Sequence, residues 1–147
     1  TDGGEARGHD IKFLSRDPLE HHQLVLESSR KSDETTVQQI SFRFSSLDGL
    51  REMKDRLNAL PKDFFKESMT PYGVNHGIAW SLYCHDPEGN RIEMFVDSPF
   101  YVRQPLVSTL DLSMSDGEIL QETRDKFGDD LSFKPLSDWS KELAERL

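Results

Sequence analysis

The sequence predicts one α+β domain, with short strands through most of the chain and helices mainly at its end. Two observations lead to this prediction. Apolar or alternating runs bounded by turn signals continue as far as residue 98, which is typical of strands. Apolar residues recur at helical spacing in one central segment, and a helix-capping motif opens the last part of the chain. At 147 residues, the chain has the length of one ordinary domain with its own core.

Two short strands are expected first, Ile11 to Ser15 and His21 to Glu27. In the second strand, alternation places His22 on the same face as Leu24 and Leu26, which favours an inward position for the imidazole. A core or edge histidine with a backbone partner would give the same pattern without any function.

A strand and a helix are expected next. The strand runs from Thr36 to Phe44, and its alternation places Gln39, Ser41 and Arg43 on one face and Ile40, Phe42 and Phe44 on the other. The helix should follow a serine cap and end before Pro61. Its apolar stripe, which should pack on the apolar face of that strand, consists of Leu47, Leu50, Met53, Leu57 and Leu60.

A β-hairpin is expected from Ile78 to Val96, and its turn is the most specific local signal in the chain. The turn Asp86-Pro87-Glu88-Gly89-Asn90 has proline at the second turn position and glycine at the fourth. The strands on either side are Ile78 to Cys84 and Arg91 to Val96. A strand and loop are expected before the hairpin, between Phe64 and Gly73.

The last part of the chain should be mostly helical. Pro99 to Leu112 has no regular pattern, but Ser115 with Glu118 three residues later forms a capping box. A helix is therefore expected from Asp116 to Phe127, and another after Ser137. The complete predicted order is β-β, then β-α-β-β-β, then an α tail.

Charge and composition exclude several classes of function. The chain has 18 basic and 27 acidic residues, a formal net charge of -9, which argues against nucleic acid and against an anionic membrane as partners. No window approaches the roughly 18 consecutive apolar residues of a transmembrane helix. Cys84 is the single cysteine, so an intrachain disulfide and a thiolate metal cluster are excluded, and the cytoplasm is the expected compartment.

Several polar residues on or beside the predicted strands are candidates for a site. Glu93 lies in the middle of a strand, either on a wet face or pointing inward with a partner. Tyr83 lies opposite it across the hairpin, His76 precedes the hairpin, and Gln39 lies on the polar face of its strand. Each of these three positions also has an explanation without function: plain packing for Tyr83, a loop position for His76 and a solvated strand face for Gln39. Taken together, the five candidates suggest a divalent-metal site with nitrogen and oxygen ligands and an acid/base histidine. They are Glu93, Tyr83, His76, Gln39 and His22.

Four motifs in this order resemble the vicinal oxygen chelate superfamily, and within it the extradiol catechol dioxygenase branch. They are HHQLVL at 21–26, QISF at 39–42, NHG at 75–77 and DPEGNRIE at 86–93. The segment PFYVRQP at 99–105 and the capped helix after it resemble a bacterial subgroup described as dioxygenase-like or glyoxalase-like. The resemblance covers about Phe13 to Leu120.

The resemblance implies a division of the chain into three parts. Residues 1–35 would be the end of a truncated first βαβββ module, and residues 36–98 a complete second module. Residues 99–147 would form a C-terminal extension, mostly helical. In this family two such modules form a curved mixed sheet around a metal. Because half a module leaves a sheet edge unpaired, a homodimer is expected.

The resemblance also implies roles for the candidate residues. Glu93 would be the metal-binding carboxylate, and Gln39 occupies the position of a metal-binding histidine. His22 and His76 would be the histidines that handle protons and oxygen beside the metal, and Tyr83 would hydrogen-bond the catechol oxygen. The metal would be iron(II) or manganese(II), bound weakly or not at all by this chain alone, because an amide oxygen is a poorer ligand than imidazole.

The function that this resemblance implies is that of a metal-dependent extradiol dioxygenase, which cleaves the ring of a small aromatic substrate. One alternative is a glyoxalase-like or epimerase-like isomerase acting on an enolisable substrate. Another is a small-ligand binding protein that has lost its metal ligands and does not turn its ligand over.

Overall fold

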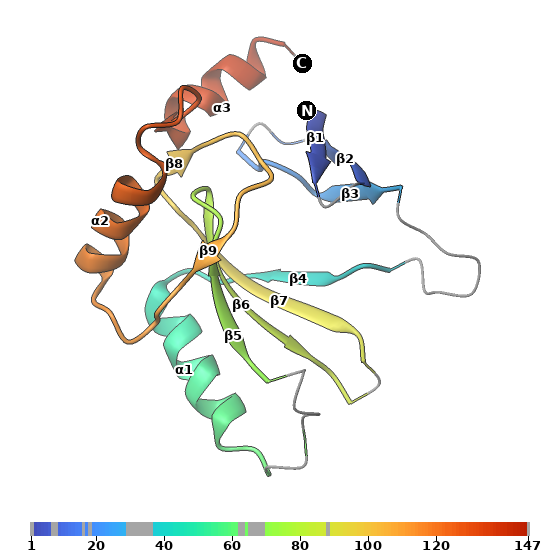
Figure 1. The fold of residues 1–147 in the computed structure, drawn as a ribbon, viewed down its shortest axis with the longest axis vertical. Helices are drawn as coiled ribbons and strands as arrows, with labels where there is room; N and C mark the ends of the chain where they lie inside the picture. The colour runs from blue at the N-terminus through green and yellow to red at the C-terminus, as the bar shows by residue number, and fades with distance from the viewer. Residues whose placement is uncertain are drawn as a thin grey trace.

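The computed structural model describes residues 2–6, 9–15, 17, 19–28, 37–61, 64, 70–87 and 89–146, and these form an α+β structure (Figure 1). Parts of the predicted segments, among them residues 16, 18, 29–36, 65–69 and 88, lie outside this description. The helices and strands in chain order are β1 (Asp2–Ala6), β2 (His9–Leu14), β3 (Leu24–Glu27), β4 (Ile40–Arg43), α1 (Leu47–Asn58), β5 (Tyr72–Asn75), β6 (Ala79–His85), β7 (Arg91–Asp97), β8 (Phe100–Tyr101), β9 (Ser108–Thr109), α2 (Asp116–Phe127), β10 (Lys134–Pro135) and α3 (Leu136–Ala144).

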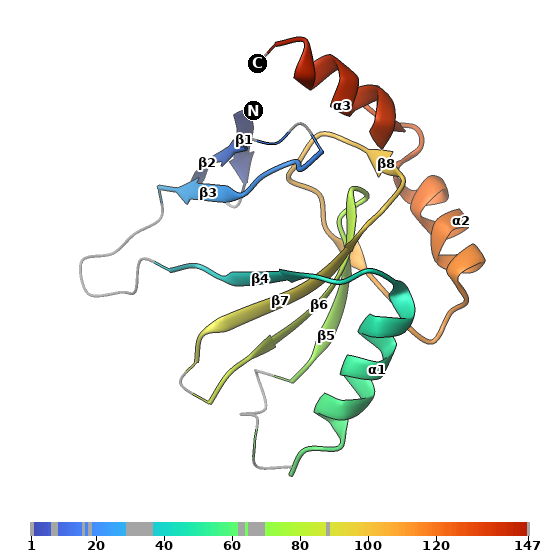
Figure 2. The same cartoon turned by 180° about the vertical axis from the view of Figure 1, so that it is seen from behind.

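The central sheet has five strands in the spatial order β4-β7-β6-β5-β9. Strand β4 runs parallel to β7, while the other neighbours are antiparallel, so the sheet is mixed. Figures 1 and 2 show that the sheet is curved, with α1 along one side of it, where the helix contacts β6 and β7. The predicted β-α-β-β-β order is present as β4-α1-β5-β6-β7.

Strands β6 and β7 form the predicted hairpin. The N–H of Gly89 donates to the carbonyl oxygen of Asp86 at 2.9 Å, and the N–H of Asp86 donates to that of Asn90 at 3.0 Å. Gly89 has a φ of 93°, in the left-handed region that glycine adopts without steric cost. The turn fixes the register of the two strands, which pairs Tyr83 with Glu93.

The core lies between α1 and the sheet. The predicted helix is confirmed, although α1 ends at Asn58, and its Leu50 is fully buried. Phe44 also packs on the core, but Ile40 and Phe42 are 44% and 53% exposed. The prediction that all three strand residues meet the helix is therefore wrong, because β4 is an edge strand of the sheet. The buried apolar cluster consists of Leu47, Leu50, Trp80, Leu82, Cys84, Met94, Val96, Leu110, Leu112 and Ile119.

A separate antiparallel sheet, in the order β1-β2-β3, forms the N-terminal part of the described chain. Strand β3 begins at Leu24, so His22 precedes it instead of sharing a strand face with Leu24 and Leu26, as the alternation predicted. Both leucines are more than half exposed. The prediction of an inward strand position for His22 is wrong, because alternation in so short a run does not distinguish a buried face from a wet one.

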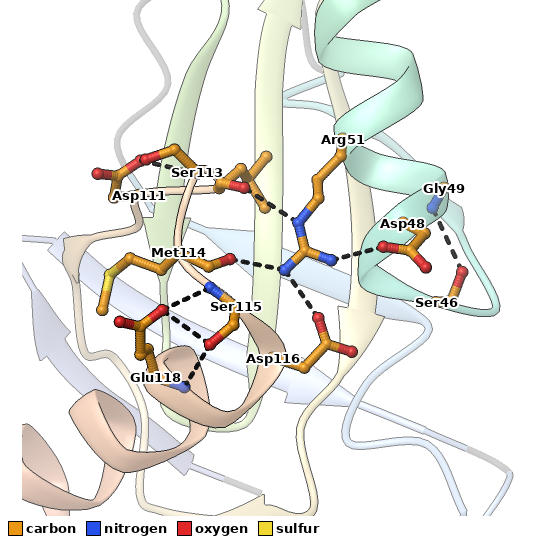
Figure 3. A network of polar contacts seen from close by, with 11 residues as sticks. Ser46, Asp48, Gly49, Arg51, Asp111, Ser113, Met114, Ser115, Asp116 and Glu118 are labelled. Atoms are coloured by element: carbon orange, nitrogen blue, oxygen red, sulfur yellow. Dashed lines mark hydrogen bonds and ion pairs between the residues drawn. The ribbon is translucent and has the colours of Figure 1, made fainter.

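Arg51 of α1 binds several groups of the C-terminal part (Figure 3). Arg51 donates to the carbonyl oxygens of Leu112 and Met114, at 3.0 and 2.8 Å, and its guanidinium also pairs with Asp48 and Asp116. The predicted capping box at the start of α2 is confirmed in both directions. None of the helices in the described part of the chain has the length and apolar character needed to cross a membrane.

Candidate functional site

The buried carboxylate of Glu93 is the centre of a polar cluster on the sheet face opposite α1, which reaches from the buried Ser81 and Tyr83 to the exposed Ser41. Glu93 is 7% exposed, so it points inward and does not lie on a wet face. Its Oε1 accepts hydrogen bonds from the hydroxyls of Ser81 and Tyr83, at 2.9 and 2.5 Å. Its Oε2 accepts hydrogen bonds from the Gln39 amide at 2.8 Å and from the Ser41 hydroxyl at 2.6 Å. Four side chains therefore share one carboxylate.

Strand register explains why these side chains meet. Tyr72, Tyr83, Glu93 and Ser41 are paired in one row across β5, β6, β7 and β4. Paired residues on neighbouring strands point to the same face of a sheet, so this row lies together on one side. Ser81 is two residues before Tyr83 and lies on the same face.

The electrostatics of the cluster are unusual because its donors are neutral. A carboxylate offers about four acceptor positions, and here two hydroxyls, a phenol and an amide fill them. Among the described residues, no cation forms an ion pair with Glu93. The buried charge is therefore stabilised by hydrogen bonds and not by a counter-ion.

Tyr83 is held as a neutral donor. Burial, reinforced by the charge of Glu93 and by their hydrogen bond, raises the pKa of Tyr83 far above its usual value of 10.0. The phenol therefore keeps its proton at neutral pH. Its ring stacks on Tyr72 at a centroid distance of 5.5 Å, and the Arg91 guanidinium carbon lies 4.4 Å from the centroid of the Tyr83 ring.

His76 extends the cluster on the side of Tyr83. Its Nδ1 lies 2.8 Å from the carbonyl oxygen of Leu106, which can only accept, so Nδ1 carries a proton. Burial lowers the pKa of His76, which favours the neutral ring, although the Leu106 carbonyl and the charge of Glu93 oppose this. The Nε2 of the neutral ring is then an acceptor, 3.0 Å from the Tyr83 hydroxyl. The hydroxyl of Tyr83 therefore has one proton and two neighbouring acceptors, Oε1 of Glu93 and Nε2 of His76.

His22 lies in the N-terminal segment before β3, and the charge of Glu93 acts on it. Burial lowers the pKa of His22, while the charge of Glu93 opposes this change and His76 adds to it. The Nδ1 atom of His22 also lies 2.8 Å from that of His21, whose ring packs against Tyr101 and Trp139.

Hydrogen bonds link four of the five residues singled out from the sequence, namely Gln39, Glu93, Tyr83 and His76, whereas His22 contacts His21 and Phe13. The sequence pattern did not indicate that Ser81, Arg91 and Tyr72 lie at the site, or that Ser41 donates to the carboxylate. The signal that could have found Ser81 and Arg91 is spacing, since each lies two residues from Tyr83 or Glu93 on the same strand.

The arrangement does not fit a bound metal ion. The Nε2 of Gln39 donates to Oε2 of Glu93 and to the Ser41 hydroxyl, so Gln39 acts as a hydrogen-bond donor to the carboxylate and not as a second metal ligand beside it. A cation at Glu93 would have to displace at least one of four donors. Within the described ranges, no group of three or more His, Cys, Asp or Glu side chains is placed to hold a metal.

No protein-family model, curated protein or solved structure matches this chain. The interpretation of the site therefore depends on its own geometry and on the motifs of the sequence.

Proposed function

We propose that this chain is a binding protein of the vicinal oxygen chelate type, which takes a small aromatic or enolisable ligand without a metal ion. The observation that carries the proposal is the saturation of Glu93 by neutral donors, including Gln39 at the position where the family resemblance implies a metal ligand. The proposal corresponds to a site that has kept the family arrangement and lost metal coordination.

The topology supports the family assignment. The segment β4-α1-β5-β6-β7 has the element order of a βαβββ module over residues 36–98, and it forms a curved sheet with its helix on one side. In this proposal, β1–β3 belong to the end of a first module within residues 1–35. Residues 99–147 form the C-terminal extension.

The energetic cost of the cluster supports a functional role. Burying a carboxylate without a counter-ion is unfavourable, even when its hydrogen bonds are complete. An apolar row at Ser41, Ser81 and Glu93 would hold the sheet together without this cost. Clusters of buried, electrostatically perturbed groups occur preferentially at functional sites. In this proposal, the Nε2 of His76 and the hydroxyl of Tyr83 bind a hydroxyl or carbonyl oxygen of the ligand.

A second candidate is the extradiol dioxygenase, with iron(II) as its metal. The observation that favours it is the convergence of Glu93, His76 and Tyr83, to which the family resemblance gives roles at the metal and the substrate. It requires the Gln39 amide to release the carboxylate, and a further ligand from another module or a second chain. A metal-dependent isomerase has the same requirement.

Ligand binding with and without metal separates these candidates. Protein stripped with a chelator is titrated calorimetrically with catechol in the absence of oxygen, and then again after iron(II) is added. The proposal predicts equal catechol binding in both titrations, weakened by Tyr83→Phe. The matched control is Tyr101→Phe, because Tyr101 stacks on Trp139 at 4.8 Å, away from Glu93. Binding that requires iron(II) would favour the dioxygenase, and no binding under either condition would overturn the proposal.

A further inference from the structure

Two directly paired residues at one end of the hairpin each have a buried polar atom without a hydrogen-bond partner among the described residues. His85 and Arg91 are directly paired across β6 and β7, next to the turn. The Nδ1 of His85 and the Nε of Arg91 are both buried, and neither has a hydrogen-bond partner in the described part of the structure. A buried donor without a partner costs about 1–3 kcal/mol, and more when it is charged. Two such atoms on one strand pair suggest that a ligand group satisfies them.

Arg91 is also a cation without an acidic partner. Within the ranges that the structure describes, it forms no ion pair, although the chain has an excess of carboxylates and a net charge of -9. By contrast, Arg43, on the same face of the sheet, is paired with Glu20 and with Asp97. A guanidinium that is left unpaired in an acidic protein is suited to an anion from outside.

The unpaired guanidinium belongs to the same region as the polar cluster. Arg91 lies over the ring of Tyr83, and its positive charge acts on His76. His85 and Arg91 are each two residues along their strands from Tyr83 and Glu93, a separation of about 7 Å. One aromatic ring with a polar group at each end spans such a distance.

We propose that Arg91 and His85 form a subsite for a carboxylate, so that the ligand is an aromatic acid with a hydroxyl at the opposite end of its ring. This inference depends on the proposed function, because the hydroxyl is assigned to His76 and Tyr83. The carboxylate accepts hydrogen bonds from the Arg91 guanidinium and from His85. The hydroxyl end lies one row further along the sheet. A hydroxybenzoate is the simplest ligand of this kind.

The test compares two ligands that differ by one carboxylate. Metal-stripped protein is titrated calorimetrically with catechol and with 3,4-dihydroxybenzoate. We expect the acid to bind at least about tenfold more tightly, the effect of one charge-assisted pair. Arg91→Gln should reduce this ratio to about two or less, while Arg91→Lys, which keeps the charge and loses the planar fork, should give an intermediate ratio.

The matched control is Arg56→Gln on the exposed surface of α1, which should keep the full ratio. If Arg91→Gln fails to fold, Arg91→Lys and His85→Phe provide the same comparison. Equal affinity for the two ligands in the parent protein, or a ratio that Arg91 variants do not change, would overturn the subsite and leave the proposed function standing. Failure of both ligands to bind would overturn the proposed function itself.

Discussion

Acid should weaken the attachment of the N-terminal segment, because His21 is buried as a neutral ring between the two ends of the chain. The His21 ring lies 5.1 Å from Phe13, 5.9 Å from Tyr101 and 5.5 Å from Trp139, measured between ring centroids. Burial, together with the neighbouring His22, lowers the pKa of His21 from 6.5 to about 3. Protonation of this ring in the folded state is therefore unfavourable.

The sign and size of the effect follow from proton linkage. Between about pH 6.5 and pH 3 the unfolded chain binds a proton on His21 and the folded chain does not, so the free energy of unfolding falls as the pH is lowered. One pKa unit corresponds to about 1.4 kcal/mol. At about pH 5, roughly 1.5 units below the unfolded pKa, His21 alone should remove about 2 kcal/mol. Because the His21 ring is partly exposed to solvent, this loss of about 2 kcal/mol in the free energy of unfolding is an upper limit.

The assay is urea unfolding at pH 7.5 and pH 5 for the parent protein and for His21→Phe, which keeps aromatic packing and cannot titrate. The parent should lose up to about 2 kcal/mol more stability than the variant between these pH values. Equal losses would show that His21 titrates normally in the folded state. That result would contradict the packing of the His21 ring against Tyr101 and Trp139.

Three further predictions concern the core, the C-terminal part and the sheet edge. Leu50→Ala should lower the free energy of unfolding by about 2–5 kcal/mol, and a loss below about 0.5 kcal/mol would mean that the stripe of α1 does not face the core. Arg51→Met should cost about 2 kcal/mol by removing hydrogen bonds to carbonyl oxygens, with the exposed Arg56→Met as control, and equal stability of the two variants would refute this role. The chain should dimerise through the edge strand β4, so sedimentation should show dimers at tens of micromolar and monomers for Phe42→Lys; a monomeric parent with a cooperative melt would contradict this.

The features that the sequence predicted best are those with local causes. The hairpin turn depends on the chemistry of 86–90, and the start of α2 depends on Ser115 and Glu118, which are three residues apart. The stripe of α1 depends on helical periodicity, and its members Leu47, Leu50, Met53 and Leu57 pack in the core as predicted, while Leu60 lies beyond the end of the helix. In each case the residues that determine the structure are neighbours in the sequence, so no knowledge of the remaining fold is needed.

The features that the sequence did not predict depend on residues far apart in the chain. The saturation of Glu93 requires β4, β6 and β7 to be in one register, with Gln39 fifty-four residues away. The direction of the Gln39 amide is then set by the carboxylate that it meets. His22 was predicted to share a strand face with Leu24, but it lies in the segment before β3, where it packs on Phe13 and His21.

In the proposed function, protein donors and not a metal ion satisfy the carboxylate of Glu93. The decisive experiment is an anaerobic calorimetric titration of the parent protein and of Gln39→His with iron(II) and manganese(II). We expect no stoichiometric binding by the parent, and a measurable gain for Gln39→His, because imidazole is a better ligand for these metals and the substitution removes one donor from the carboxylate. Tight stoichiometric binding by the parent, abolished in Glu93→Ala and unchanged in Gln39→His, would contradict this proposal.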